Sequence, residues 1–534
     1  MLSKAELAAA IRQEGGMSRR LFLRWSAALA ALPVVARQVE GRQQSRPRFV
    51  DAPFSLGVAS GDPDESSFVI WTRLAPRPLE PQGGMPAEKI EVRWEVAEDE
   101  GMKKIVRQGT ALATPQLAHA VHVVVPGLSP DRWYYYRFHS GDATSPVGRA
   151  RTTPPRSSLP QRLRFAFASC QHYEQGLYTA YEHMAQDDLD LVFHLGDYIY
   201  EGPASVKGVR KHAGPAKTRL QTLEDYRIRH AQYRSDPLLH GMHARCPWVV
   251  TWDDHEFDNN YANDISEVPN TDPVEFLWRR TNAYQAYYEH MPLRPTSIPR
   301  GPDMQLYRTI HFGRLAAFQV LDTRQYRTDQ PNGDRLSPLD VDALNPRNTL
   351  LGRQQRGWLL SQLLQSQATW NVLAQQVMMA MVDVDITEGK GYSMDQWPGY
   401  AYERMQLLRW IADRRISNPI VLTGDIHLHW CNELRVDDRK PEQPVVAVEF
   451  VGSSISSGGN SRPAKEQEYT ESLKAQNPCV KFFNSQRGYV RCEVTPQTWQ
   501  SDYVVIEDVL KPGSPAVVKG KFVVESGQPG VKAG

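Results

Sequence analysis

The sequence has few cysteines, almost no net charge and no apolar run long enough to cross a bilayer. Five cysteines in 534 residues are too few for a disulfide scaffold. One bond between Cys479 and Cys492 would suit an exported protein, although the sequence does not establish connectivity. The formal net charge is +1, and no basic block has the size of a nucleic-acid footprint. A membrane span needs ~20 apolar residues, so we expect no transmembrane anchor.

What is present suits a soluble globular protein with a sizeable core. Hydrophobic residues make up 41% of the chain and charged residues 23%. The length exceeds that of most single domains and is comfortable for two. No internal repeat and no low-complexity run interrupts the sequence.

The first residues resemble an export signal. Ser18-Arg19-Arg20-Leu21-Phe22-Leu23 precedes a short, weakly apolar stretch that ends at Ala36. Paired arginines, a short apolar region and a small residue are typical of a twin-arginine signal peptide, which we place at residues 1–36. The alternative is an arginine-rich amphipathic helix that packs on the body of the protein. Export predicts the twin-arginine translocation machinery as a partner and a periplasmic or secreted location.

Residues 50–153 predict an all-β domain. They form short segments rich in Val, Ile, Trp and Tyr, in which apolar and polar side chains alternate between Gly and Pro clusters. This pattern favours a sandwich of the immunoglobulin or fibronectin kind. A proline-stiffened linker would then span 152–161. The expected strands are 66–74, 89–98, 118–128 and 132–140.

Residues 162–510 predict a second domain in which strands and helices alternate. Apolar strands are expected at 163–169 and 189–196, and such alternation favours an α/β sheet or two sheets covered by helices. We expect the last twenty residues to be an ordinary polar terminus. The helices are expected at 175–187, 222–235, 273–290, 353–366 and 403–415.

Four of the apolar segments end in side chains that can bind metals. The blocks FHLGDYIYEG (193–202), TWDDHEFDNN (251–260) and VLTGDIHLHW (421–430) turn abruptly from β-prone residues to carboxylates and imidazoles, and a further strand ends at Cys170. Ligands of open α/β sheets lie beyond the carboxyl ends of the strands, so these side chains can meet at one place. Oxygen donors with histidine suggest metal ions, and clustered metal ions suggest hydrolysis.

Each of these residues also has a plain structural interpretation. Cys170 alone is more often a small buried hydrophobe, Asp197 after a glycine is commonly a turn or helix cap, and Tyr200 could be a packed aromatic. Packing does not require four strands to end in potential ligands, so their joint occurrence favours a metal site. A thiolate and a phenolate would favour oxidised iron over zinc, whereas carboxylates and carbonyls would favour calcium or magnesium.

The ordered set of a strand-ending cysteine, GDYIYE, DDHE and GDIH resembles the alkaline phosphatase D (PhoD) family, a branch of the calcineurin-like metallophosphoesterases. The resemblance covers nearly the whole chain after the export segment. It implies an α/β (α+β) fold in which a sandwich of two β-sheets is flanked by helices and preceded by the all-β domain. Further matching segments are WTRL (71–74), YRIRHAQYRSDP (226–237), LDTRQYR (321–327) and NVLAQQVMMA (371–380).

The resemblance also implies two kinds of metal ion. The Fe³⁺ ligands would be Cys170, Asp197, Tyr200 and His427. Asp197 would bridge to Ca²⁺, which Asp254 and Asp425 would bind from the other side. Asn259 or Asn260 is a further candidate oxygen ligand, and the sequence does not choose between them.

Two residues are expected to act on the substrate. The resemblance makes His255 the catalytic side chain that protonates the leaving oxygen or steadies the transition state. Arg324 either grips a phosphate oxygen with its two-pronged donors or forms a structural ion pair. In the loop 381–402, which we expect beside the cleft, Trp397 and Tyr400 either contact substrate or, as we favour, brace the loop.

The leading hypothesis is an exported alkaline phosphatase, a monomer that hydrolyses small phosphomonoesters and phosphodiesters by attack of metal-bound hydroxide. A phospholipase-D-like phosphodiesterase acting on lipid head groups or teichoic acids is the alternative among hydrolases. An adhesive β-sandwich protein with an inactive metal site is the non-enzymatic alternative. It is disfavoured because every motif position holds a competent residue.

Overall fold

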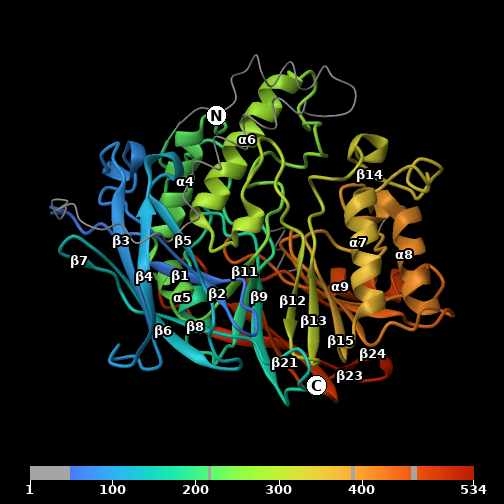
Figure 1. The fold of residues 1–534 in the computed structure, drawn as a ribbon. Coiled ribbons are helices and arrows are strands. Elements are labelled where there is room, and N and C mark those ends of the chain that lie inside the picture. Colours follow the sequence, from blue (N-terminus) through green and yellow to red (C-terminus); the bar gives the residue numbers. More distant parts are fainter. Residues whose placement is uncertain (1–47, 215–217, 387–390, 459–465) are drawn as a thin grey trace.

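The computed structural model describes residues 48–214, 218–386, 391–458 and 466–534, so the predicted signal segment 1–36 lies outside the described residues. Two large β-sheets form the centre of the molecule (Figure 1). The first has ten strands, in the order β24 (Gln528–Ala533), β23 (Ala516–Glu525), β22 (Thr498–Ile506), β21 (Gly488–Val494), β9 (Leu163–Ala168), β10 (Leu191–His194), β11 (Trp248–Val250), β1 (Val58–Gly61), β2 (Phe68–Arg73) and β5 (Ala120–Val125).

The second sheet has seven strands, and its central strands are parallel. Their order is β12 (Arg308–Phe312), β13 (Ala316–Val320), β15 (Trp370–Ala374), β17 (Pro419–Thr423), β19 (Ala447–Val451), β18 (His429–Leu434) and β20 (Val480–Asn484).

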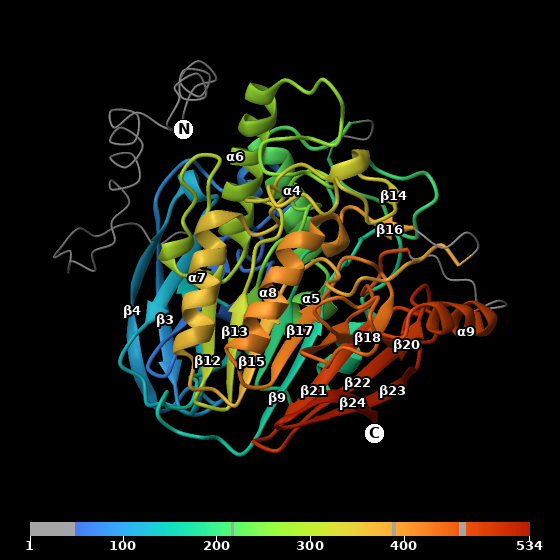
Figure 2. The same ribbon diagram turned by 90° about the vertical axis from the view of Figure 1, so that its right-hand side faces the viewer.

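Helices cover the outer faces of both sheets, as the two views show (Figures 1 and 2). The predicted helices are confirmed to within a residue or two, except that the first is much shorter than 175–187. On the first sheet lie α3 (Thr179–Met184), α4 (Leu223–Arg234), α5 (Pro237–His243) and α6 (Pro273–His290); on the second lie α7 (Gly352–Gln365), α8 (Ala401–Asp413) and α9 (Glu466–Gln476).

Side chains that point alternately to the two faces of each strand explain the four layers, which are helices, sheet, sheet and helices. In β9, Phe165 and Phe167 point into the core between the sheets, while Ala166 and Ala168 belong to the core beneath the helices. Phe165 meets Phe318 of the second sheet edge to face, with ring centroids 5.4 Å apart. Strands buried on both faces read as continuous apolar runs, which is why these segments were recognisable in the sequence.

The N-terminal β-strands are confirmed, and their arrangement adds a feature that the sequence did not predict. β1, β2 and β5 continue the ten-stranded sheet beyond β11, so one sheet runs through both halves of the chain. Phe68 and Ile70 of β2 pack against the second layer of the sandwich. That layer consists of β4 (Ile105–Ala113), β3 (Ile90–Ala97), β6 (Trp133–Ser140), β7 (Ala143–Thr144) and β8 (Gly148–Arg151).

One expectation about the C-terminal part is wrong, and the structure answers a question about the cysteines that the sequence left open. The last twenty residues are not a plain polar terminus, because β23 and β24 form a hairpin on β22 at the edge of the first sheet, where Phe522 packs on Phe482 and Tyr503. Cys479 and Cys492 are not joined, and all five cysteines are free and buried. Cys479 lies in the core under α7 and α8, whereas Cys492 on β21 faces the core between the sheets.

Candidate metal centre

The strand ends singled out in the sequence meet at one edge of the two sheets. β9, β10 and β11 are parallel neighbours, so their carboxyl ends point the same way. β17 ends at this edge from the opposite sheet, and a parallel bridge between Ser169 and Ser454 joins the loops that follow β9 and β19. Residues far apart in the chain therefore lie side by side.

Four residues that follow these strands have an unusual backbone conformation. Cys170, Asp197, Asp425 and His427 have φ angles of +58°, +56°, +61° and +57°, in the left-handed region that residues with a Cβ rarely adopt. The structure holds them there; the Cys170 N–H, for example, donates to the Gly196 carbonyl at 3.1 Å. Backbone strain of this kind is characteristic of ligand and active sites.

The glycines before the two acids are needed for different reasons. Gly196 has φ +113°, and a Cβ there would lie 2.5 Å from the Asp253 Cβ. At Gly424 the reason is close approach, because a Cβ would lie 2.6 Å from the Ser169 hydroxyl. Gly196 therefore lets the chain turn tightly between β10 and Asp197.

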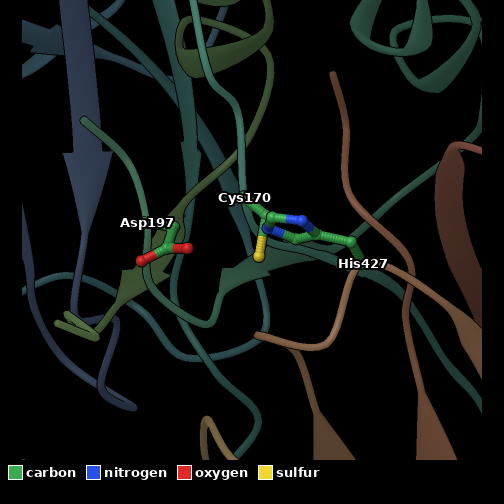
Figure 3. Close-up of side chains that lie close together, drawn as sticks. All are labelled: Cys170, Asp197 and His427. Atoms are coloured by element: carbon green, nitrogen blue, oxygen red, sulfur yellow. The ribbon is translucent and has the colours of Figure 1, made fainter. Parts of the chain in front are cut away.

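Cys170, Asp197 and His427 converge with their ligand atoms within 4.8 Å of one another (Figure 3). The Tyr200 hydroxyl donates to Asp197 Oδ2 at 2.9 Å and lies 3.2 Å from His427 Nε2. His427 Nδ1 lies 2.9 Å from the Gly458 carbonyl, an arrangement that places a proton on Nδ1 and leaves Nε2 free to bind a metal. The four residues predicted to hold one metal ion thus form a single cluster.

A second cluster of carboxylates adjoins the first. Asp197, Asp254 and His255 have ligand atoms within 4.8 Å of one another, and so do Asp253, Asp254 and Asp425. Asp197 belongs to both sides of the site, which is the position expected of a bridging carboxylate. The donor set changes across the site, from sulfur, phenol and imidazole to carboxylates.

The electrostatics of the site fit a bound cation. Burial, reinforced by neighbouring carboxylates, raises the pKa of the Asp197 carboxyl well above its ordinary value. Its Oδ1 atom is buried and has no hydrogen-bond partner. Burial and the Asp197 charge likewise raise the pKa of the Cys170 thiol. A buried carboxylate or thiolate is costly without a positive partner, and a metal ion would supply one.

His255 lies beside the carboxylate cluster and is partly exposed. Its side chain is 21% exposed, and its Nδ1 lies 2.8 Å from Oε2 of the buried Glu201. The ring lies against that of Tyr200, with centroids 4.2 Å apart. Burial works against the imidazolium, but Glu201, Asp254 and Asp197 outweigh it and raise the pKa of His255 well above its ordinary value.

Arg324 is fully buried and surrounded by carboxylates. Its Nη1 donates to Asp395 at 2.8 Å, its Nη2 donates to Asp425 at 2.8 Å, and its Nε donates to Asp253. Asp254 lies 3.6 Å from Nη2. With all three nitrogens engaged, this geometry favours the structural ion pair, and a grip on substrate phosphate stays a prediction without geometric support.

The loop 381–402 borders the site, as expected, through residues that the sequence had not singled out. Asp395 holds Arg324, and the Gln396 amide donates to Asp425 Oδ2 at 2.5 Å. Trp397 and Tyr400 are buried, and the Tyr400 hydroxyl donates to the Thr328 carbonyl at 2.7 Å. Bracing by the aromatic residues is confirmed.

Neither Asn259 nor Asn260 directs its side-chain amide at the carboxylate cluster. The Asn260 N–H donates to Asp254 Oδ2 at 2.7 Å, which places its backbone beside the site. The side-chain amides point elsewhere, that of Asn259 to Glu267 and that of Asn260 to Asp334.

Three further residues support the site in roles that the sequence did not predict. Glu256 accepts hydrogen bonds from the N–H groups of Asp197, Tyr198 and Asp253. Glu201 orients His255. Glu201 and Glu256 both lie inside the motifs GDYIYE and DDHE, so their place in the sequence could have indicated a role in the site. Ser457, which donates to the Tyr200 hydroxyl at 2.7 Å, lies in a serine-rich segment that carried no signal.

Comparison with known proteins agrees with this geometry. The family model described as "PhoD-like phosphatase" matches residues 165–503, and that of its N-terminal domain matches residues 40–154. Alkaline phosphatase D of Bacillus subtilis (strain 168) is 50% identical over 531 residues, which cover 97% of this chain and 90% of that protein. The solved structure titled "Structure of PhoD" is 51% identical, covers 91% of this chain and 93% of its own, and superposes with a TM-score of 0.87. The chain belongs to the PhoD-like phosphatase family.

Proposed function

We propose that this protein is an exported, metal-dependent alkaline phosphatase that hydrolyses phosphomonoesters and phosphodiesters. A relative named alkaline phosphatase D that is 50% identical over nearly the whole chain supports this activity. The observation that carries the proposal is the convergence of Cys170, Asp197 and His427 with Asp254 and Asp425 at one strand edge. No motif position is lost, which argues against an adhesive protein with an inactive site.

The donor atoms support Fe³⁺ on one side of Asp197 and Ca²⁺ on the other. Thiolate, phenolate and imidazole donors from Cys170, Tyr200 and His427 suit an oxidised iron ion. Carboxylates from Asp254 and Asp425 suit calcium, which prefers oxygen ligands. Metal ions at such a place lower the pKa of a water molecule and offset charge on a phosphoryl group.

The protein's own side chains would orient the substrate and move the proton. Glu201 binds Nδ1 of His255, so Nε2 is the ring nitrogen that would face the substrate. A protonated Nε2 would donate to the leaving oxygen as the ester bond breaks. Arg324 would hold the carboxylates of Asp254 and Asp425 in place rather than contact the phosphate.

Elemental analysis combined with two ester substrates tests the proposal. We expect about one iron with one or two calcium ions per chain, which the donor sets on either side of Asp197 would suit. We also expect hydrolysis of both nitrophenyl phosphate and bis-nitrophenyl phosphate at alkaline pH. Zinc or no metal, with neither ester hydrolysed, would contradict it.

Exposed apolar side chains keep the lipid-directed alternative open to test. Val206 and Val209 are 91% and 48% exposed, on the loop that follows Glu201. Leu336 and Val341, on the segment that follows Arg327, are 60% and 83% exposed. Faster release of head groups from phosphatidylcholine vesicles than of nitrophenol from the soluble diester would favour a phospholipase-D-like enzyme.

Export and the oligomeric state complete the proposal. We propose that residues 1–36 direct the chain through the twin-arginine pathway to the periplasm or the medium, and that it acts as a monomer. The paired arginines at Arg19 and Arg20 support export. Among the described residues, no helix is both long enough and apolar enough to span a bilayer. Replacing both arginines with lysine should retain the protein inside the cell.

A further inference from the structure

Residues 453–457, which follow β19 after one glycine, include four serines and yet lie in the interior. Ser453, Ser454, Ser456 and Ser457 are all completely buried. A buried hydroxyl is costly unless it is hydrogen-bonded, so a run of them needs a reason beyond filling space. The Ser454 hydroxyl donates to the Ser457 carbonyl within the segment. The other three hydroxyls have partners on the strand-end loops that carry the predicted metal ligands.

Ser457 joins two of those loops with one side chain. Its Oγ lies 2.7 Å from the Tyr200 hydroxyl and 2.7 Å from the Cys170 carbonyl, and it accepts the His172 N–H at 3.0 Å. The Ser457 N–H also donates to the Cys170 carbonyl, at 3.1 Å. The next residue, Gly458, accepts the hydrogen bond from His427. Two consecutive residues therefore contact three of the four residues predicted to hold one metal ion.

The contacts of Tyr200 single out the Ser457 hydroxyl. Within the described part of the chain, the phenol oxygen has two polar partners besides Ser457, namely Asp197 and His427, and both are themselves predicted ligands. Those two groups would turn to a metal ion when it binds. Ser457 is then the donor that remains to fix the phenol oxygen, because a hydroxyl can point its proton at a lone pair that the metal does not use.

The contacts of Cys170 lead to the same residue. Its backbone is held at φ +58°, a conformation that costs on the order of 1–3 kcal/mol for a residue with a Cβ. The carbonyl of Cys170 accepts the N–H groups of Ser456 and Ser457, at 3.4 and 3.1 Å. The Ser457 hydroxyl has a single proton, which it donates either to this carbonyl or to the Tyr200 oxygen, each 2.7 Å away. Without the hydroxyl, the strained turn that aims Sγ toward Asp197 and His427 (Figure 3) would be less firmly held.

We propose that Ser457 is a positioning residue that presents Tyr200 and Cys170 to the metal ion. The inference rests on the proposed function, since it requires a metal ion between Cys170, Asp197, Tyr200 and His427. Ser457 itself need not bind the metal. Its hydroxyl holds Tyr200 and Cys170 in place before the metal ion binds, so that less conformational entropy is lost on binding.

Metal affinity of purified, metal-stripped protein tests this directly. The probe is Co²⁺ alone, whose visible absorption reports thiolate and phenolate ligation, titrated in competition with a chelator. We expect Ser457→Ala to bind Co²⁺ about 10–100-fold more weakly, the usual effect of losing a hydrogen bond to a metal ligand. Ser457→Gly also removes the hydroxyl and should weaken Co²⁺ binding to a similar extent; it serves if Ser457→Ala does not fold.

The matched control is Ser456→Ala. Ser456 lies in the same segment and is equally buried, but its hydroxyl donates to the His172 carbonyl at 3.0 Å and touches no predicted ligand side chain. It should bind Co²⁺ as the unsubstituted protein does. Unchanged Co²⁺ affinity in Ser457→Ala, or an equal loss in Ser456→Ala, would overturn the inference.

The same titration separates this inference from the proposed function. If the unsubstituted protein binds Co²⁺ and hydrolyses nitrophenyl phosphate after reloading while Ser457→Ala matches it, only the role of Ser457 is refuted. If the unsubstituted protein neither binds Co²⁺ nor hydrolyses the ester, the proposed function and this inference both fail.

Discussion

Arg324→Gln distinguishes a structural arginine from one that grips substrate. In the structure, Arg324 is the cation that Asp253, Asp254, Asp395 and Asp425 share. Removing one partner of a buried ion pair leaves uncompensated charge and costs roughly 3–5 kcal/mol. Larger domains lose about 2 °C of melting temperature per kcal/mol, so we expect a fall of about 6–10 °C.

The assay is thermal unfolding in the presence of a chelator, repeated after metal loading. Bound metal ions would neutralise Asp254 and Asp425 in part, so loading should reduce the deficit of Arg324→Gln. Arg327→Gln is the matched control, because Arg327 is also buried and bonded to Asp395 at 2.8 Å but, among the described residues, forms no ion pair with Asp254 or Asp425. It should destabilise the protein without a comparable loss of metal affinity.

The kinetic result decides the role of Arg324. A positioning arginine predicts lost metal affinity and lower turnover of reloaded enzyme, with little change in KM for nitrophenyl phosphate. A normal melting temperature together with a much raised KM would refute this reasoning and restore Arg324 as a phosphate-binding residue.

Four further predictions follow from single contacts. Cys170→Ser should remove most of the metal ion and the visible charge-transfer colour while the fold survives, and retention of both would take Cys170 out of the site. His255→Ala should lower turnover with metal content nearly unchanged, since its Nδ1 is held by a carboxylate; loss of metal on elemental analysis would make it a ligand instead. Gly196→Ala should reduce soluble, metal-binding protein, because the Cβ would meet Asp253 at 2.5 Å, and a normal melting curve would contradict this. Burial lowers the pKa of His122 from 6.5 to about 4, so the unfolded chain takes up a proton before the folded protein does as the pH falls. The stability that neutral His122 contributes is therefore present above pH 6.5 and is lost as the pH falls toward 4, by roughly 3 kcal/mol. His122→Gln should flatten the acid side of the pH–stability curve.

Local pattern alone predicted much of the architecture. The helix 273–290 coincides with α6, whose start is marked by Asp272 as N-cap and Pro273 in the first turn. The apolar runs before Cys170 and Asp197 proved to be β9 and β10. Helix starts and apolar strands depend on residues that are neighbours in the chain, so a single stretch of sequence can predict them. The C-terminal hairpin of β23 and β24 was not predicted, because its strands are half exposed and contain lysine and glycine, as is common at a sheet edge.

The candidate site divides in the same way. The sequence by itself determined which strand ends carry ligand-capable side chains, because each motif is local and its residues are chemically distinctive. Only the tertiary structure decided which of these side chains meet and which further residues hold them. Cys170 and Ser457 lie 287 residues apart and meet because β9 and β19 end at the same edge of facing sheets. The burial of Arg324 among four carboxylates likewise depends on the order of strands, which no single stretch of the sequence specifies.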